Sequence, residues 1–144
     1  MKIKNYLDKF KLNKDNCIVV GSGILKALNL RENKDIDVIT TKEKYEELLS
    51  NPNFEEKQSH GHGVLTDDLF EISIDWTVLD KTWTFKDLTN QSIIIDDVRY
   101  TTIEFLLKAK KSWIEKGEIR QKDLDDVQLM EDYLLNKKRA NVIK

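Results

Sequence analysis

The chain has 144 residues, of which 40% are hydrophobic and 35% are charged, and its formal net charge is −2. This length fits a single domain, residues 1–144. No apolar run reaches the ~20 residues that a membrane-spanning helix needs, and the basic N-terminus lacks a signal-peptide core, so we expect no membrane association. The single cysteine, Cys17, excludes an internal disulfide and favours a cytoplasmic location. No basic stripe with interleaved aromatic residues marks a dedicated nucleic-acid binder.

The first half of the chain alternates between predicted helices and strands. Short apolar runs ended by turn residues indicate strands, and apolar residues at helical spacing indicate helices. In chain order, the sequence predicts a helix at 3–11, a strand at 17–20, a glycine turn at 21–23, a helix at 24–30, a strand at 35–40 and a helix at 42–50.

The second half carries further strands and then two helices. We expect a strand at 54–57, a loop at 59–63, a strand of strict alternation at 69–76, an edge strand at 92–95, and helices at 102–116 and 120–136 that are separated by Gly117. Residues 81–91 stay unassigned, and 137–144 are expected to fray. The predicted class is therefore α/β (α+β): a short mixed sheet flanked by helices over residues 15–100, then a helical part over 101–136.

Two aspartates lie on the strand predicted at 35–40. Successive strand residues point to opposite faces, so Asp35 and Asp37 share one face, about 6.6 Å apart along the strand. Neighbouring carboxylates repel each other unless a cation neutralises them. Magnesium suits such a site, because it binds one or two carboxylates together with substrate phosphates. Solvent-facing acids on an amphipathic sheet remain the alternative.

The strand predicted at 69–76 repeats this arrangement. Alternation places Glu71, Ser73 and Asp75 on one face of it. If this strand neighbours the first, Asp75 completes a cluster of three carboxylates that could hold two metal ions about 3.5–4 Å apart.

A glycine-rich turn precedes the two aspartates. Gly21 and Ser22 lie between a predicted strand and a predicted helix, where backbone N–H groups favour phosphate and a serine hydroxyl adds a hydrogen bond. The turn lacks the lysine of a P-loop. Alone it could be only a tight connection, but the aspartates that follow make the pattern more specific.

Together these residues resemble a known superfamily. Gly21-Ser22, then Asp35-Ile36-Asp37-Val38, then a later strand aspartate, is similar to the signature of the DNA polymerase β-type nucleotidyltransferases. The segments 30–37, 103–110 and 120–127 resemble its small bacterial members, among them antibiotic nucleotidyltransferases and nucleotidyltransferase-like toxins and antitoxins. The resemblance covers roughly residues 15–135.

The resemblance implies a minimal nucleotidyltransferase fold and its activity. This is the transfer of a nucleoside monophosphate from an NTP, such as ATP, to a hydroxyl of a small molecule, an RNA end or a protein. Asp35, Asp37 and Asp75 would be the catalytic and metal-binding residues for two Mg²⁺ ions, which Mn²⁺ could replace. Gly21 and Ser22 would bind the phosphates. A non-catalytic binding protein on the same fold, such as a toxin–antitoxin partner, is one alternative. A nucleic-acid-binding module that uses the basic C-terminal segment is another.

Two cations are further candidates for nucleotide binding. Lys110 falls on the apolar stripe of its helix, where it could bind phosphate or pair with Asp123, an acid on the apolar stripe of the next helix. Arg31 could neutralise phosphate or brace Asp35 or Asp37.

The remaining polar and aromatic candidates are weaker. His60 and His62 lie in a glycine-flanked loop that is more typical of a substrate-facing segment than of a zinc site. Cys17 is expected to be a buried packing residue. Trp76 and Trp83 are expected to pack in the core or at its rim.

Overall fold

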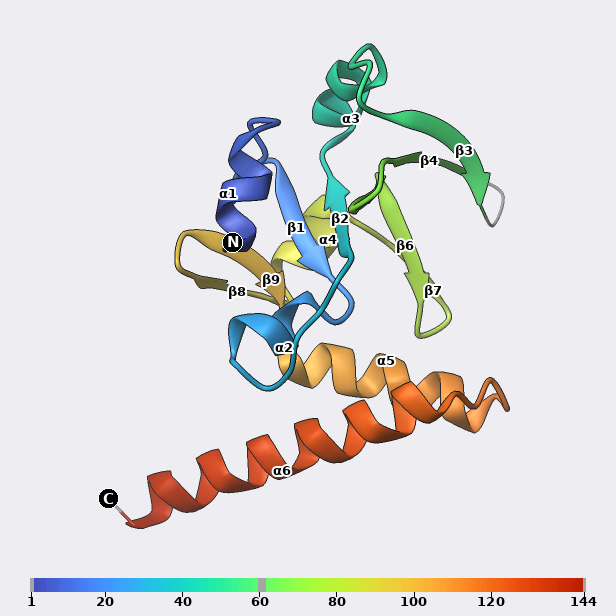
Figure 1. The fold of residues 1–144 in the computed structure, drawn as a ribbon. Coiled ribbons are helices and arrows are strands. Elements are labelled where there is room, and N and C mark those ends of the chain that lie inside the picture. Colours follow the sequence, from blue (N-terminus) through green and yellow to red (C-terminus); the bar gives the residue numbers. More distant parts are fainter. Residues whose placement is uncertain (1, 60–61, 144) are drawn as a thin grey trace. The chain divides into compact units, whose positions relative to one another are not determined.

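A computed structural model describes residues 2–59 and 62–143. The chain divides into two compact units, Met1–Thr102 and Ile103–Lys144, called here the N-terminal unit and the helical unit. The described residues form a mixed α+β fold that ends in two helices, in agreement with the predicted class (Figure 1). The boundary between the units lies beside residue 101, where the sequence predicts the helical part to begin.

The strands of the N-terminal unit belong to two sheets. The described strands are β1 (Cys17–Val20), β2 (Ile36–Thr40), β3 (Glu55–Ser59), β4 (His62–Thr66), β5 (Phe70–Ser73), β6 (Asp75–Val78), β7 (Lys81–Thr84), β8 (Ser92–Ile95) and β9 (Val98–Thr101). Seven of these described strands form one sheet in the order β3-β4-β5-β2-β1-β9-β8, and β6 pairs with β7 in a separate hairpin. β1 runs antiparallel to β2 and parallel to β9, while β2 runs parallel to β5. The larger sheet is therefore mixed, as predicted.

Four short helices accompany these strands in the described part of the N-terminal unit. They are α1 (Ile3–Asp8), α2 (Gly23–Ala27), α3 (Lys42–Leu49) and α4 (Phe85–Thr89). Side-chain caps explain where two of them begin. The Thr41 hydroxyl accepts a hydrogen bond from the Lys44 amide at the start of α3, and Thr84 and Asp87 form a reciprocal capping box at the start of α4.

The core lies along β1 and β2. All four residues of β1 are buried, and in β2 every residue is buried except Asp37. A continuous apolar run such as Cys17–Val20 is typical of a strand that is covered on both faces. Burial raises the pKa of the Cys17 thiol to about 12, so the thiol stays protonated at neutral pH. Cys17 is thus a packing residue, as predicted.

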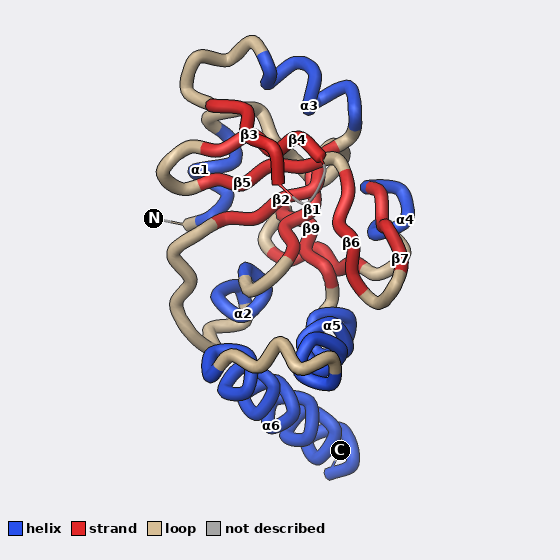
Figure 2. Tube along the Cα trace, turned by 90° about the vertical axis from the view of Figure 1, so that its right-hand side faces the viewer, coloured by secondary structure: helices blue, strands red, loops and turns tan. Residues whose placement is uncertain are grey.

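The region predicted as one strand at 69–76 is in fact two, which corrects the sequence analysis. A bend at Ile74 separates β5 from β6, and the two strands join different sheets (Figure 2). β6 instead pairs with β7, and the Trp83 indole donates a hydrogen bond to the Val78 carbonyl at 2.8 Å. Leu79 and Asp80 connect β6 and β7 with φ of 56° and 58°, which is typical of a two-residue hairpin turn.

Other boundaries also differ from the prediction. The helix predicted at 24–30 ends at Ala27, and the expected loop at 59–63 overlaps the ends of β3 and β4. The sequence analysis missed β9, and the unassigned residues 81–91 contain β7 and α4. The predicted strands at 17–20 and 92–95 are confirmed, the latter as the edge strand β8.

The helical unit consists of two antiparallel helices among its described residues, α5 (Ile103–Glu115) and α6 (Gln121–Ile143) (Figure 1). Gly117 ends α5 with φ of 86°. The amides of Gly117 and Glu118 bond back to the carbonyls of Ile114 and Trp113, which is the Schellman arrangement. The predicted break at Gly117 is confirmed, but the predicted fraying after residue 136 is wrong, because α6 continues to Ile143. Among the described helices, none has the length and apolar character that crossing a bilayer requires.

Gly23 sets how closely α2 approaches β1. A Cβ placed at position 23 would overlap the Val19 side chain. We expect Gly23→Ala to lower the free energy of unfolding by about 1–3 kcal/mol through overpacking, although alanine is the better helix former. Urea unfolding monitored by circular dichroism measures this loss. The loss should shrink in a Val19→Ala background, and an equal loss in both backgrounds would contradict the packing explanation.

Candidate functional site

The glycine turn and Asp37 lie against each other. Val20, the last residue of β1, is the register partner of Asp37 on β2, and Gly21 follows with φ of 65°. A Cβ placed on Gly21 would lie 3.4 Å from an Asp37 carboxylate oxygen. Ser22 precedes α2 and makes no capping hydrogen bond through its side chain. Two of the sequence-predicted elements, the turn and one carboxylate, are therefore together.

Strand pairing explains the position of Asp37. β2 lies between β1 and β5, so Asp37 is flanked by Val20 on one side and by Glu71 on the other. Asp37 is half-buried within an otherwise buried strand, whereas Glu71 is exposed. The backbone of Asp37 is thus held by the hydrogen-bond ladder of the larger sheet.

Asp75 lies on the β6–β7 hairpin. It is the first residue of β6, pairs in register with Thr84 of β7 and is half-buried. Its strand contacts β2. The bend at Ile74 therefore places Asp75 on the hairpin and removes it from the face that the sequence analysis assigned to Glu71, Ser73 and Asp75.

Asp35 lies outside β2 and is exposed. Its backbone carbonyl accepts a hydrogen bond from the Asn33 side chain at 2.7 Å. It lines a cavity of about 160 Å³ together with Lys26 and Lys34. Asp37 and Asp75 do not line this cavity.

The predicted cluster of three carboxylates is not assembled in the part of the chain that the structure describes. No three His, Cys, Asp or Glu side chains among these residues are placed to hold a metal ion. The donor set still suits magnesium, whose usual protein ligands are one or two carboxylates with phosphate oxygens. Of the three predicted acids, Asp37 is the one that lies beside the glycine turn.

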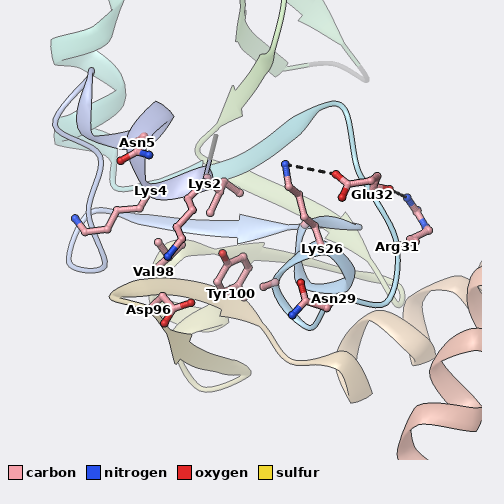
Figure 3. Close-up of a pocket in the computed structure, with 13 residues that line it drawn as sticks. Lys2, Lys4, Asn5, Lys26, Asn29, Arg31, Glu32, Asp96, Val98 and Tyr100 are labelled. Atoms are coloured by element: carbon pink, nitrogen blue, oxygen red, sulfur yellow. Dashed lines mark hydrogen bonds and ion pairs between the residues drawn. The ribbon is translucent and has the colours of Figure 1, made fainter.

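Arg31 lies in the segment that follows α2. Its guanidinium donates a hydrogen bond to the Glu32 carbonyl at 2.7 Å, and its side chain lines a cavity of about 930 Å³ (Figure 3). Ser22, Asp37 and Asp75 are not among the described residues that line it. Gly23, the last residue of the predicted glycine turn, lines the same cavity as Arg31.

Lys110 forms the structural pair that the sequence analysis offered as one alternative. Its ammonium lies 2.7 Å from a carboxylate oxygen of Asp123 and 3.1 Å from one of Asp126. All three side chains are buried, and Arg120 adds a 2.9 Å contact to Asp123. This arrangement corrects the assignment of Lys110 to nucleotide binding, because two buried carboxylates already neutralise it.

The sequence analysis missed Asp126 in this cluster. Asp126 follows Asp123 by three residues, which is the spacing of side chains on one helix face. This spacing from an acid on the apolar stripe could have predicted that Asp126 joins the cluster. Of the histidine loop, His60 lies outside the described residues, and position 62 begins β4. Trp76 and Trp83 face each other in the β6–β7 register and are half-buried, which agrees with a role as rim aromatics.

Comparison of the chain with protein-family models, with curated proteins and with solved structures gave no match.

Replacement of Lys110 should lower the stability of the folded chain. Lys110→Met leaves Asp123 and Asp126 buried without their shared cation, and we expect a loss of about 3–5 kcal/mol in the free energy of unfolding. Lys111→Met is the matched control, because Lys111 is exposed and contacts Glu131 at 3.6 Å, so its loss should stay below about 1 kcal/mol. Chemical denaturation of both variants tests this. Equal losses would show that the buried cluster is not stabilising.

The same cluster predicts acid sensitivity. Burial pushes the pKa of Asp123 upward, but the hydrogen bonds and charges of Arg120 and Lys110 outweigh it, so the pKa lies below its ordinary value. A depressed pKa in the folded state gives stability that is present above the unfolded pKa and is lost as pH falls through the folded pKa. We expect the free energy of unfolding to decline below about pH 4. Asp123→Asn should flatten this decline, and an unchanged slope in urea titrations would contradict it.

Proposed function

We propose that the chain is a magnesium-dependent nucleotidyltransferase with a minimal nucleotidyltransferase fold. It transfers a nucleoside monophosphate from an NTP to an acceptor hydroxyl and releases pyrophosphate. The observation that carries this proposal is the proximity of the Asp37 carboxylate to Gly21, where an added Cβ would lie 3.4 Å from a carboxylate oxygen. Binding of a metal–nucleotide complex needs a turn whose backbone can approach phosphate. It also needs a carboxylate close to that turn, as on the neighbouring strand here.

Each residue of the turn and the adjoining strands has a proposed role. Gly21 has no side chain, so its backbone can approach the β- and γ-phosphates closely, and the Ser22 hydroxyl, which is not used as a helix cap, donates a hydrogen bond to a phosphate oxygen. Asp37 and Asp75 would hold magnesium, and Asp35 is the proposed third acid. Bound magnesium would polarise the phosphoryl group and neutralise charge on the leaving pyrophosphate.

The protein itself contributes position and proton transfer. Asp75 would accept the proton of the acceptor hydroxyl as the hydroxyl oxygen attacks the α-phosphorus, which requires the two to lie within hydrogen-bond reach. The turn would hold the triphosphate so that the leaving pyrophosphate departs on the side opposite the attack. The acceptor, whether a small molecule, an RNA end or a protein, would approach from the side of the β6–β7 hairpin.

A specific observation favours a second candidate function. Because three acids are not gathered among the described residues, the same fold could serve as a non-catalytic binding protein, as in a toxin–antitoxin pair. This alternative predicts a stable protein complex that is unaffected by replacement of Asp37, and no transfer of label from any NTP.

Nucleotide binding by the purified chain separates these functions. With Mg²⁺ and each labelled NTP, we expect binding that Asp37→Asn weakens at least about ten-fold, because a charge-assisted contact is worth about 1.5–3 kcal/mol. Calorimetry or filter binding measures the affinity. Asp132→Asn is the matched control, because Asp132 is exposed on α6. Absence of binding at millimolar nucleotide would exclude the enzyme.

A further inference from the structure

A large cavity lies in the N-terminal unit beside α2. Its volume is about 930 Å³, within the range of small-molecule sites. The start of α1, the length of α2 with the segment that follows it, and the β8–β9 hairpin form its walls (Figure 3). None of Ser22, Asp35, Asp37 and Asp75 is among the described residues that line it.

Cationic side chains predominate in this cavity. Lys2, Lys4, Lys26 and Arg31 line it, against the carboxylates of Glu32 and Asp96. Lys4 is engaged by acids outside the cavity, Asp8 at 3.1 Å and Asp97 at 3.6 Å. Lys2 at the start of α1, Lys26 on α2 and Arg31 in the segment after α2 also line the cavity, so the combined field of these cations favours an anion.

The carboxylate next to Lys26 is a weak competitor for it. Glu32 lies 3.8 Å from the Lys26 ammonium and its side chain is 91% exposed. Ion pairs of this kind contribute at most about 1 kcal/mol. An incoming dianion can therefore replace Glu32 as the partner of Lys26 without breaking a buried contact.

The floor of the cavity is apolar. Ile3, Ala27, Val98 and Tyr100 contribute to it, and Val98 and Tyr100 are buried. Burial raises the pKa of the Tyr100 phenol to about 12, so the hydroxyl keeps its proton at neutral pH. A ligand that fills this space needs an organic portion as well as a charge, because a bare inorganic anion would leave the floor uncovered.

We propose that this cavity binds a small organic phosphate, with Arg31 and Lys26 on the phosphate group and the organic portion against Tyr100. Arg31 offers several N–H donors in one plane, which matches phosphate geometry. The carboxylates of Glu32 and Asp96 disfavour an extended polyanion such as RNA, which would place further phosphates beside them. The proposal does not rest on nucleotidyl transfer, although Lys26 also lines the smaller cavity beside Asp35.

Titration with 1-naphthyl phosphate in EDTA tests this proposal, because the absence of magnesium disables the proposed nucleotide site. We expect amide shifts in NMR spectra at Lys26, Asn29, Asp96 and Tyr100. The double variant Lys26→Gln/Arg31→Gln should bind at least about ten-fold more weakly, whereas Lys57→Gln, an exposed residue of β3, should bind as the natural chain does. The uncharged analogue 1-naphthol should bind more weakly than the phosphate.

A variant that binds the probe more tightly than the natural chain cannot be explained by misfolding. Glu32→Gln removes the competing carboxylate and should tighten binding several-fold, while Glu55→Gln should leave it unchanged. Asp37→Asn should also leave it unchanged, which separates this site from the nucleotide site. Shifts centred on Gly21 and Ser22, equal affinity of the double variant, or no shift at millimolar probe would each overturn the proposal.

Discussion

The close packing of α2 on β1 is the constraint on which the N-terminal unit depends. Gly23 permits it, because any Cβ at that position would overlap Val19 in the middle of the most deeply buried strand. The turn that joins the two elements is consequently short, and Gly21 adopts a left-handed conformation directly against Asp37. The candidate site thus follows from a packing requirement in the core, and the same helix supplies Lys26 to the separate cationic cavity.

Local patterns were sufficient to predict the centre of the fold. The apolar run Cys17–Val20 and the alternation from Ile36 onward identified β1 and β2, and Gly117 identified the end of α5. The hairpins were missed for a physical reason. Their turns, Leu79-Asp80 and Asp96-Asp97, adopt positive φ at all four residues. Such turns are usually recognised in a sequence by Asn-Gly, Asp-Gly or Gly-Gly, and these two turns contain no glycine.

The candidate site could be predicted only in part from sequence. Spacing identifies residues that share a strand face, and this was enough to associate Asp37 with the glycine turn. It could not locate Asp75, because the strict alternation of residues 69–76 conceals the bend at Ile74, and a bend is decided by the tertiary partners of Trp76 and Val78. For Lys110 the sequence did indicate the partner, because Asp123 lies on the apolar stripe of the following helix.

The single-residue bend at Ile74 has a consequence for how the site could work. Asp37 lies in the seven-stranded sheet, whereas Asp75 lies in the β6–β7 hairpin, which is joined to β5 through Ile74 and to α4 at Thr84. A cation that bound both carboxylates would therefore tie the hairpin to the larger sheet.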